Sequence, residues 1–192
     1  MFDFKEILET GTFLGNTTGH FAKLFSPPFT TSQVSIATCE LDKRFHALAL
    51  MRLKQFSHIT FYQGDSRDFL GQLLPQDPNN LSLIYLDAHW HNDLPLRTEL
   101  LIIKDKRPNS VILIDDFEVP GDSGYFYDNY GPGKALKFSD FQPEFKKLGF
   151  IPYSPRAKSN EETGARRGCV ILALEGEMTK VLDKMTSICR AI

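Results

Sequence analysis

Two short apolar runs that end abruptly in carboxylates constrain the fold of this chain more than any other feature. They are residues 81–91, LSLIYLDAHWH, and residues 110–117, SVILIDDF. A buried parallel strand has such a continuous apolar run. Because open α/β sheets bind ligands outside the carboxyl ends of their strands, we expect the polar residues that follow both runs to converge. These residues are Asp87, Asp115 and Asp116, with His89 and His91 just beyond the first run.

The remainder of the chain alternates short apolar runs with helical patterns, which predicts right-handed βαβ units. We therefore expect an α/β fold, a Rossmann-like, doubly wound and mostly parallel sheet of seven strands, in a single domain over residues 1–192. Residues 150–153 and 169–174 read as an antiparallel hairpin at the sheet edge. Residues 177–190 have the apolar spacing of a terminal helix.

Two loops interrupt this pattern. Residues 118–133 are too long and too aromatic for a simple connector, so they are either a lid over an acceptor or a loop that packs its own aromatic side chains. The aromatic residues are Tyr125, Phe126, Tyr127 and Tyr130. A second loop, within residues 154–168, is polar, and its basic side chains either contact an acidic substrate or are solvated, of which we favour the second. Those are Arg156, Lys158, Arg166 and Arg167.

Charge and composition narrow the class of partner. The chain has 22 basic and 24 acidic side chains and a net charge of -2, which gives no reason to expect a nucleic acid partner. Three cysteines without metal-ligand spacing predict reduced thiols in a cytoplasmic protein. We find no signal peptide and no apolar run of about 18 residues, so we expect no membrane partner. Whether the apolar C-terminal segment is core or a homo-oligomer interface stays open.

A glycine-punctuated turn follows the first predicted strand. Gly11, Gly15 and Gly19 lie four residues apart, which is not the G-x-G-x-x-G spacing of dinucleotide-binding proteins. Glycines at this place let a ligand approach the backbone. Glu40 ends the second predicted strand, where a carboxylate can accept the hydroxyls of a ribose. Asp65 and Ser66 lie at the end of the third predicted strand, where their polar groups can contact an adenine.

The ordered motifs ETGTFLG, CELD and GDSRD resemble those of class I S-adenosylmethionine-dependent methyltransferases. The resemblance covers nearly the whole chain. It implies S-adenosylmethionine as the cofactor, with the methionine end near Glu9, the ribose on Glu40 and the adenine beside Ser66. The cofactor-binding residues that it implies are Glu9, Gly11, Thr12, Gly15, Glu40, Asp65, Ser66 and Asp87.

Clustered carboxylates repel one another unless a cation or protons intervene, and oxygen ligands of this kind suit Mg²⁺. Here the chain resembles the metal-dependent O-methyltransferases, both the catechol type and, in LDAHW, the macrocin O-methyltransferase and cephalosporin hydroxylase-like group. The resemblance implies methyl transfer to a hydroxyl of a small molecule. It implies a Mg²⁺ or other divalent cation held by Asp87, Asp115 and Asp116.

The sequence departs from the catechol type at the general base. Trp90 stands where those enzymes have a lysine. His89 or His91, beside Asp87, can take the proton instead, because an imidazole titrates near neutral pH.

Three alternatives remain open. Glu40 can also serve NAD in an oxidoreductase, although the glycine spacing and the paired aspartates argue against it. The chain can also be a catalytically silent nucleoside-binding module. Finally, Asp87, His89 and His91 resemble part of a two-histidine, one-carboxylate iron site of a hydrolase or hydroxylase.

Overall fold

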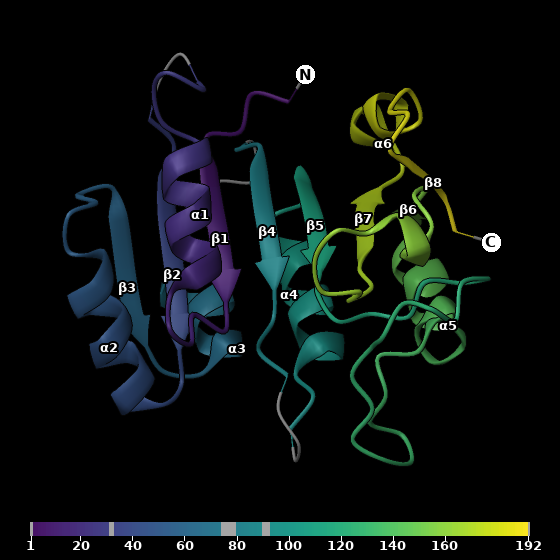
Figure 1. The fold of residues 1–192 in the computed structure, drawn as a ribbon, viewed down its shortest axis with the longest axis horizontal. Helices are drawn as coiled ribbons and strands as arrows, with labels where there is room; N and C mark the ends of the chain where they lie inside the picture. The colour runs from purple at the N-terminus through teal and green to yellow at the C-terminus, as the bar shows by residue number, and fades with distance from the viewer. Residues whose placement is uncertain (1, 31–32, 74–79, 90–92, 192) are drawn as a thin grey trace.

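Eight strands form one sheet in the computed structural model, which describes residues 2–30, 33–73, 80–89 and 93–191. Their order across the sheet is β3-β2-β1-β4-β5-β7-β6-β8 (Figure 1). The strands are β1 (Glu6–Thr10), β2 (Ser35–Glu40), β3 (Ile59–Gln63), β4 (Ser82–Leu86), β5 (Ser110–Ile114), β6 (Phe150–Pro155), β7 (Val170–Leu174) and β8 (Ile188–Arg190). The mixed α/β fold with a mostly parallel sheet is confirmed.

Strand direction changes only on one side of the sheet. The pairs among β1 to β5 are parallel, whereas β7 is antiparallel to β5 and to β6, as the predicted hairpin requires. The number of strands was underestimated, because β8 pairs with the outer edge of β6. The helix predicted over residues 177–190 is correspondingly wrong in its second half. It ends at Leu182, and the apolar Ile188 belongs to the edge strand.

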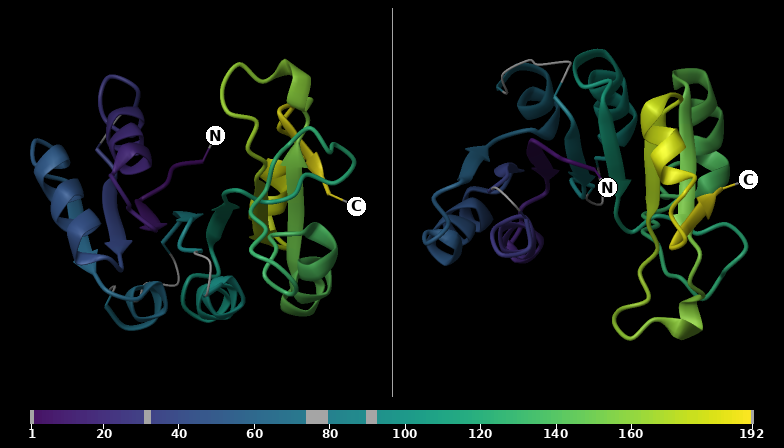
Figure 2. Two further views of the ribbon diagram at one scale, coloured as in Figure 1. Left: turned by 60° about the horizontal axis from the view of Figure 1, so that its bottom comes forward. Right: turned by 90° about the horizontal axis from the view of Figure 1, so that it is seen from above.

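Helices cover both faces of the sheet (Figure 2). They are α1 (Asn16–Leu24), α2 (Lys43–Leu53), α3 (Ser66–Asp68), α4 (Leu96–Lys106), α5 (Phe138–Leu148) and α6 (Glu177–Leu182), and a π-helical turn, Phe69–Leu73, extends α3. The largest buried cluster joins side chains of α4 and α5 to one face of the strands. Two smaller clusters pack α1, α2 and α6, and Leu83 of β4 contacts both of them, which places these helices on the other face.

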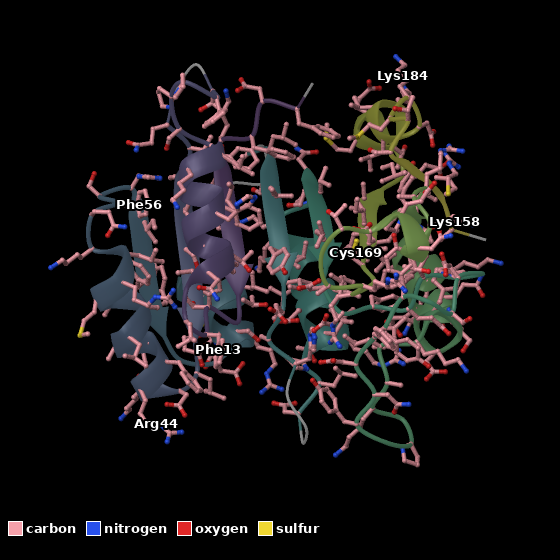
Figure 3. All side chains as sticks on the ribbon, in the orientation of Figure 1. Phe13, Arg44, Phe56, Lys158, Cys169 and Lys184 are labelled. Atoms are coloured by element: carbon pink, nitrogen blue, oxygen red, sulfur yellow. The ribbon has the colours of Figure 1, made fainter. Side chains whose placement is uncertain are left out.

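Because β1, β2, β4 and β5 are parallel, their carboxyl ends lie at one edge of the sheet, the lower edge in Figure 1. Phe13, just after β1, lies toward that edge in Figure 3, and Lys184, just after α6, lies at the opposite one. Within the described ranges, no helix is long and apolar enough to cross a membrane.

Candidate active site

Strand register brings the predicted site residues to one place. Thr10 of β1 pairs with Cys39 of β2 and with Leu86 of β4, and Leu86 pairs with Ile114 of β5. The ladder continues one step further, because the Asp87 N–H donates to the Thr10 carbonyl at 3.0 Å and the Asp115 N–H donates to the Leu86 carbonyl at 3.1 Å. The residues that follow these four strands therefore lie at one edge of the sheet, next to one another along the strand order.

The first group at this edge is the glycine-turn cluster: Glu9, Gly11, Thr12, Gly15 and Glu40. Gly11 has a φ of 83°, and a Cβ there would lie 2.3 Å from the Asp87 carbonyl oxygen. The N–H groups of Gly11 and Thr12 both donate to the Cys39 carbonyl, at 2.9 and 3.1 Å. The turn is thus held by backbone contacts that only glycine permits at position 11.

Glu9 is buried under this turn, with 1% of its surface exposed. The hydroxyls of Thr18 and Thr38 donate to its carboxylate, the second at 2.5 Å. The Thr38 hydroxyl also lies 2.5 Å from that of Thr12. Burial raises the pKa of Glu9 to about 7, although the two hydrogen bonds oppose the shift. Glu9 therefore acts within this structure as an anchor between β1, β2 and α1.

Glu40 points its carboxylate into the turn. It accepts the N–H of Phe13 at 2.7 Å on one oxygen and the N–H of Asp42 at 2.8 Å on the other. Phe13 has a φ of 46°, an unusual conformation for a side chain of this size. Because a carboxylate has about four acceptor positions, each oxygen keeps capacity for a further donor such as a ribose hydroxyl.

Asp65 and Ser66 lie at the end of β3, as predicted. Asp65 caps α3 by accepting the Arg67 N–H at 2.8 Å. The Arg67 guanidinium, 2.5 Å from the Asp65 carboxylate, holds the pKa of that carboxyl below its ordinary value. Ser66 is buried.

Glu99 of α4 is a buried carboxylate that the sequence analysis missed. It is 2% exposed, and the hydroxyl-bearing residues beside it are Ser66 and Thr10. Its Oε1 has no hydrogen-bond partner in the described part of the chain. Burial raises the pKa of Glu99 to about 7. The sequence contained an indication of this burial, because position 99 falls on the apolar face of the helix that Leu96, Leu100 and Ile103 define.

The second group is the aspartate cluster: Asp87, His89, Asp115 and Asp116. Ligand atoms of Asp87, His89 and Asp116 lie within 4.8 Å of one another. Asp115 is adjacent, but its carboxylate accepts the hydroxyl of Tyr85. Burial, and then the charges of Asp115 and Asp116, raise the pKa of Asp87 to about 8. The structure thus brings two of the three predicted metal-ligating aspartates together with a histidine.

His89 is buried, with 6% of its surface exposed. Its Nε2 lies 3.6 Å from carboxylate oxygens of Asp87 and Asp128 and makes no hydrogen bond among the described residues. Burial lowers the pKa of His89. The other candidate base, His91, lies outside the described residues, as does Trp90.

Arg167 is an exposed loop residue, as the favoured interpretation of the sequence predicts, but it is also paired with two carboxylates, which the sequence did not indicate. Its guanidinium donates to Asp116 through Nε and to Asp128 through Nη2. Asp116 is itself in the left-handed region, with a φ of 51°. Burial alone would raise the pKa of Asp128, but hydrogen bonds from Tyr130 and Arg167 outweigh it and lower that pKa. Sequence separations of 51 and 39 residues concealed both contacts.

The aromatic residues of the long loop differ in their surroundings, and the expected lid stays a prediction. Tyr125 is buried and donates to the Glu162 carboxylate at 2.9 Å, so it packs within the loop region. Tyr130 donates to Asp128 and lies 3.5 Å from the His89 carbonyl. Phe126 is 63% exposed. Of these residues, Tyr130 is thus the one placed beside the aspartate cluster.

Solved structures share this architecture. No protein-family model matches the chain, and no curated protein matches it by sequence. The O-methyltransferase TomG from Streptomyces achromogenes, which acts in tomaymycin synthesis and was solved with S-adenosylmethionine, superposes with a TM-score of 0.60 at 18% identity, over 90% of this chain and 74% of TomG.

Two further methyltransferases extend the comparison. PaMTH1 from Podospora anserina, solved with S-adenosylhomocysteine, gives a TM-score of 0.64 at 16% identity, over 90% of this chain and 72% of PaMTH1. The CurJ carbon methyltransferase gives 0.61 at 14% identity, over 88% of this chain and 48% of CurJ. The chain therefore has the class I S-adenosylmethionine-dependent methyltransferase fold.

Proposed function

We propose that this chain is an enzyme that transfers the methyl group of S-adenosylmethionine to a hydroxyl of a small molecule with the help of a divalent cation. The observation that carries the proposal is the placement of the glycine-turn cluster directly beside the aspartate cluster, at the carboxyl ends of adjacent strands. Ligands of open α/β sheets bind at this edge. The fold alone does not choose the acceptor, since CurJ methylates carbon and TomG oxygen.

The glycine-turn cluster supplies groups for each part of the cofactor. Glu40 accepts the ribose hydroxyls with its remaining lone pairs, as its two backbone hydrogen bonds fix its orientation. Gly11 and Gly15, both at positive φ, form the turn above the buried Glu9, where the methionine end would lie. Ser66 and Asp65 border the adenine from the end of β3.

The aspartate cluster supplies groups for the acceptor. Its oxygen and nitrogen donors fit a divalent cation, because ligand atoms of two carboxylates and one imidazole lie within 4.8 Å of one another. Such a cation, when bound, lowers the pKa of an acceptor hydroxyl and fixes its oxygen. The oxygen then forms a bond to the methyl carbon while the carbon–sulfur bond breaks, and the hydroxyl proton passes to a base of this cluster. Asp87 and His89 are the described candidates, and each can act as the base only where it does not itself bind the cation.

A calorimetric titration of the full chain tests the cofactor first. S-adenosylmethionine and its demethylated product should bind with and without Mg²⁺, and NAD should not bind. Binding of NAD in place of the sulfonium cofactor would support the oxidoreductase alternative and overturn the proposal. Binding of the cofactor without methyl transfer to any hydroxyl acceptor would support the silent nucleoside-binding module.

A further inference from the structure

The aspartate cluster differs from the three-carboxylate set expected from the sequence. Among the described residues, the group whose ligand atoms all lie within 4.8 Å of one another is Asp87, His89 and Asp116. Asp115, whose carboxylate accepts the Tyr85 hydroxyl, is not in this group. The group of neighbouring ligand atoms therefore holds one nitrogen and two oxygen donors.

The buried imidazole is the independent sign of a ligand. Burying a polar nitrogen without a hydrogen bond costs on the order of 1–3 kcal/mol, and Nε2 of His89 is such a nitrogen among the described residues. The His89 side chain is 4% exposed, and Nε2 lies 3.6 Å from both Asp87 and Asp128. That distance is too long for a hydrogen bond, so the nitrogen points at the carboxylates without bonding them.

The 3.6 Å between His89 Nε2 and the Asp87 carboxylate oxygen suits two atoms that bind the same cation. Two bonds of about 2.1 Å whose outer atoms lie 3.6 Å apart enclose an angle of roughly 120°, which a metal centre accommodates. An imidazole donor also changes which cation is preferred. Carboxylate sets suit Mg²⁺, whereas imidazole suits first-row transition metals, whose affinity for sites with nitrogen and oxygen donors rises from Mn²⁺ to Cu²⁺ and is lower again for Zn²⁺.

We infer that Asp87, His89 and Asp116 form a mixed nitrogen–oxygen site that takes a transition cation such as Mn²⁺ in preference to Mg²⁺, and that Arg167 competes with this cation for Asp116. The role of the cation in catalysis rests on the proposed function, but its binding does not. His89 is then a ligand, and its nitrogen is not free to act as the general base.

The competition follows from the contacts of Arg167. Its guanidinium bonds Asp116 and Asp128 at the same time, so it supplies positive charge to the cluster. A divalent cation on Asp116 would repel a guanidinium held on the same carboxylate. The Arg167 side chain is 38% exposed and reaches the cluster from the loop between β6 and β7, so it has water available when it is displaced.

Titration of the full chain with Mn²⁺ and with Mg²⁺, without cofactor, tests the inference by electron paramagnetic resonance and calorimetry. We expect Mn²⁺ to bind at least about tenfold more tightly than Mg²⁺. The His89→Ala change should weaken Mn²⁺ binding by about tenfold or more and Mg²⁺ binding by less, so that the preference is lost. Equal affinities in the unaltered chain, or an unchanged Mn²⁺ affinity in His89→Ala, would overturn the inference.

A second measurement keeps the test decisive if His89→Ala does not fold. Electron spin-echo spectra of Mn²⁺ bound to the unaltered chain should show a directly coordinated nitrogen, and a purely oxygen-ligated ion would contradict the inference. Arg167→Gln should raise the Mn²⁺ affinity severalfold, whereas the exposed neighbour change Arg166→Gln should leave it unchanged. Equal Mn²⁺ affinities of these two variants would show that Arg167 does not compete with the cation for Asp116.

The outcomes separate this inference from the proposed function. Nitrogen-ligated Mn²⁺ in a chain that binds no S-adenosylmethionine would leave the cation site standing and overturn methyl transfer. Cofactor binding with no nitrogen-ligated cation would do the reverse.

Discussion

The glycine-turn cluster and the aspartate cluster lie side by side, yet they are organised by different forces. In the first, the carboxylates of Glu40 and Glu9 accept hydrogen bonds from backbone N–H groups and threonine hydroxyls of β1, β2 and α1. In the second, the carboxylates of Asp87, Asp115 and Asp116 crowd one another, and Arg167 from a distant loop supplies a counter-charge. The carboxylates of the first cluster are thus neutralised by hydrogen bonds alone, whereas those of the second are the ones for which we propose a cation.

The largest expected effect comes from the point where the two clusters touch. Gly11→Ala would place a Cβ 2.3 Å from the Asp87 carbonyl oxygen at a φ of 83°. We expect a loss of more than about 3 kcal/mol in the free energy of unfolding, or a displaced β4 end, measured by urea denaturation. Gly133→Ala is a matched control, because its φ is 72° and nothing lies within 4 Å of its Cβ. That variant should lose only about 1 kcal/mol. Similar losses in both would show that the contact with β4 is unimportant.

Glu99 tests whether buried charge under the glycine-turn cluster is tolerated. Its pKa is raised by burial from 4.5 to about 7, so the folded state holds its proton more tightly than the unfolded state does. The stability that this proton provides is present below pH 4.5 and is lost as the pH rises through about 7. Glu99→Gln should remove this loss.

The variant should therefore become more stable than the unaltered chain by about 3 kcal/mol at most as the pH rises from 4.5 to 8. Urea denaturation at several pH values measures the difference. Glu9 titrates in the same window in both proteins, so it cancels. The exposed change Glu175→Gln is the control and should show no such trend. A parallel pH profile in Glu99→Gln would mean that Glu99 is not buried as described.

Glu40 sharpens the comparison through the cofactor. Glu40→Gln keeps the size of the side chain but removes its charge and one acceptor oxygen, so binding of S-adenosylhomocysteine should weaken by about 2 kcal/mol, or roughly 30-fold. Calorimetry measures the change. Asp115→Asn, in the aspartate cluster, should change the affinity for S-adenosylhomocysteine much less. A larger loss in Asp115→Asn than in Glu40→Gln would contradict the assignment of the cofactor to the glycine-turn cluster.

Tyr85 gives the smallest of these effects. Tyr85→Phe deletes the hydroxyl that donates to Asp115 and leaves a partly buried carboxylate without that partner. The free energy of unfolding should fall by about 1 kcal/mol. Added Mg²⁺ should restore part of it, because Asp115 becomes available as an oxygen ligand. No restoration would place Asp115 too far from the cation.

The same division explains how much the sequence could predict. The strand runs, the glycine turn and the positions of Glu40, Asp87 and Asp115 follow from local patterns, because parallel strands align their carboxyl ends whatever the loops do. Arg167 could not be predicted, since its contact with Asp116 spans 51 residues and depends on how the β6–β7 loop folds back.

The sequence could have indicated two other features that the prediction missed, the Tyr85–Asp115 contact and the last strand. Tyr85 and Asp87 lie two residues apart and share a face of β4, where Asp115 of the next strand end can meet either. The C-terminal segment carried apolar residues that suit a helix or a strand, and the free edge of β6 decided for a strand at Ile188–Arg190.

A crystal structure of the full chain with S-adenosylhomocysteine and Mn²⁺, with the anomalous signal of manganese recorded, tests the division between the clusters most directly. We predict the ribose hydroxyls on Glu40, one manganese peak bounded by Asp87, His89 and Asp116, and Arg167 withdrawn from Asp116. Cofactor bound away from the glycine turn, or manganese on Asp115 with His89 uncoordinated, would contradict the account.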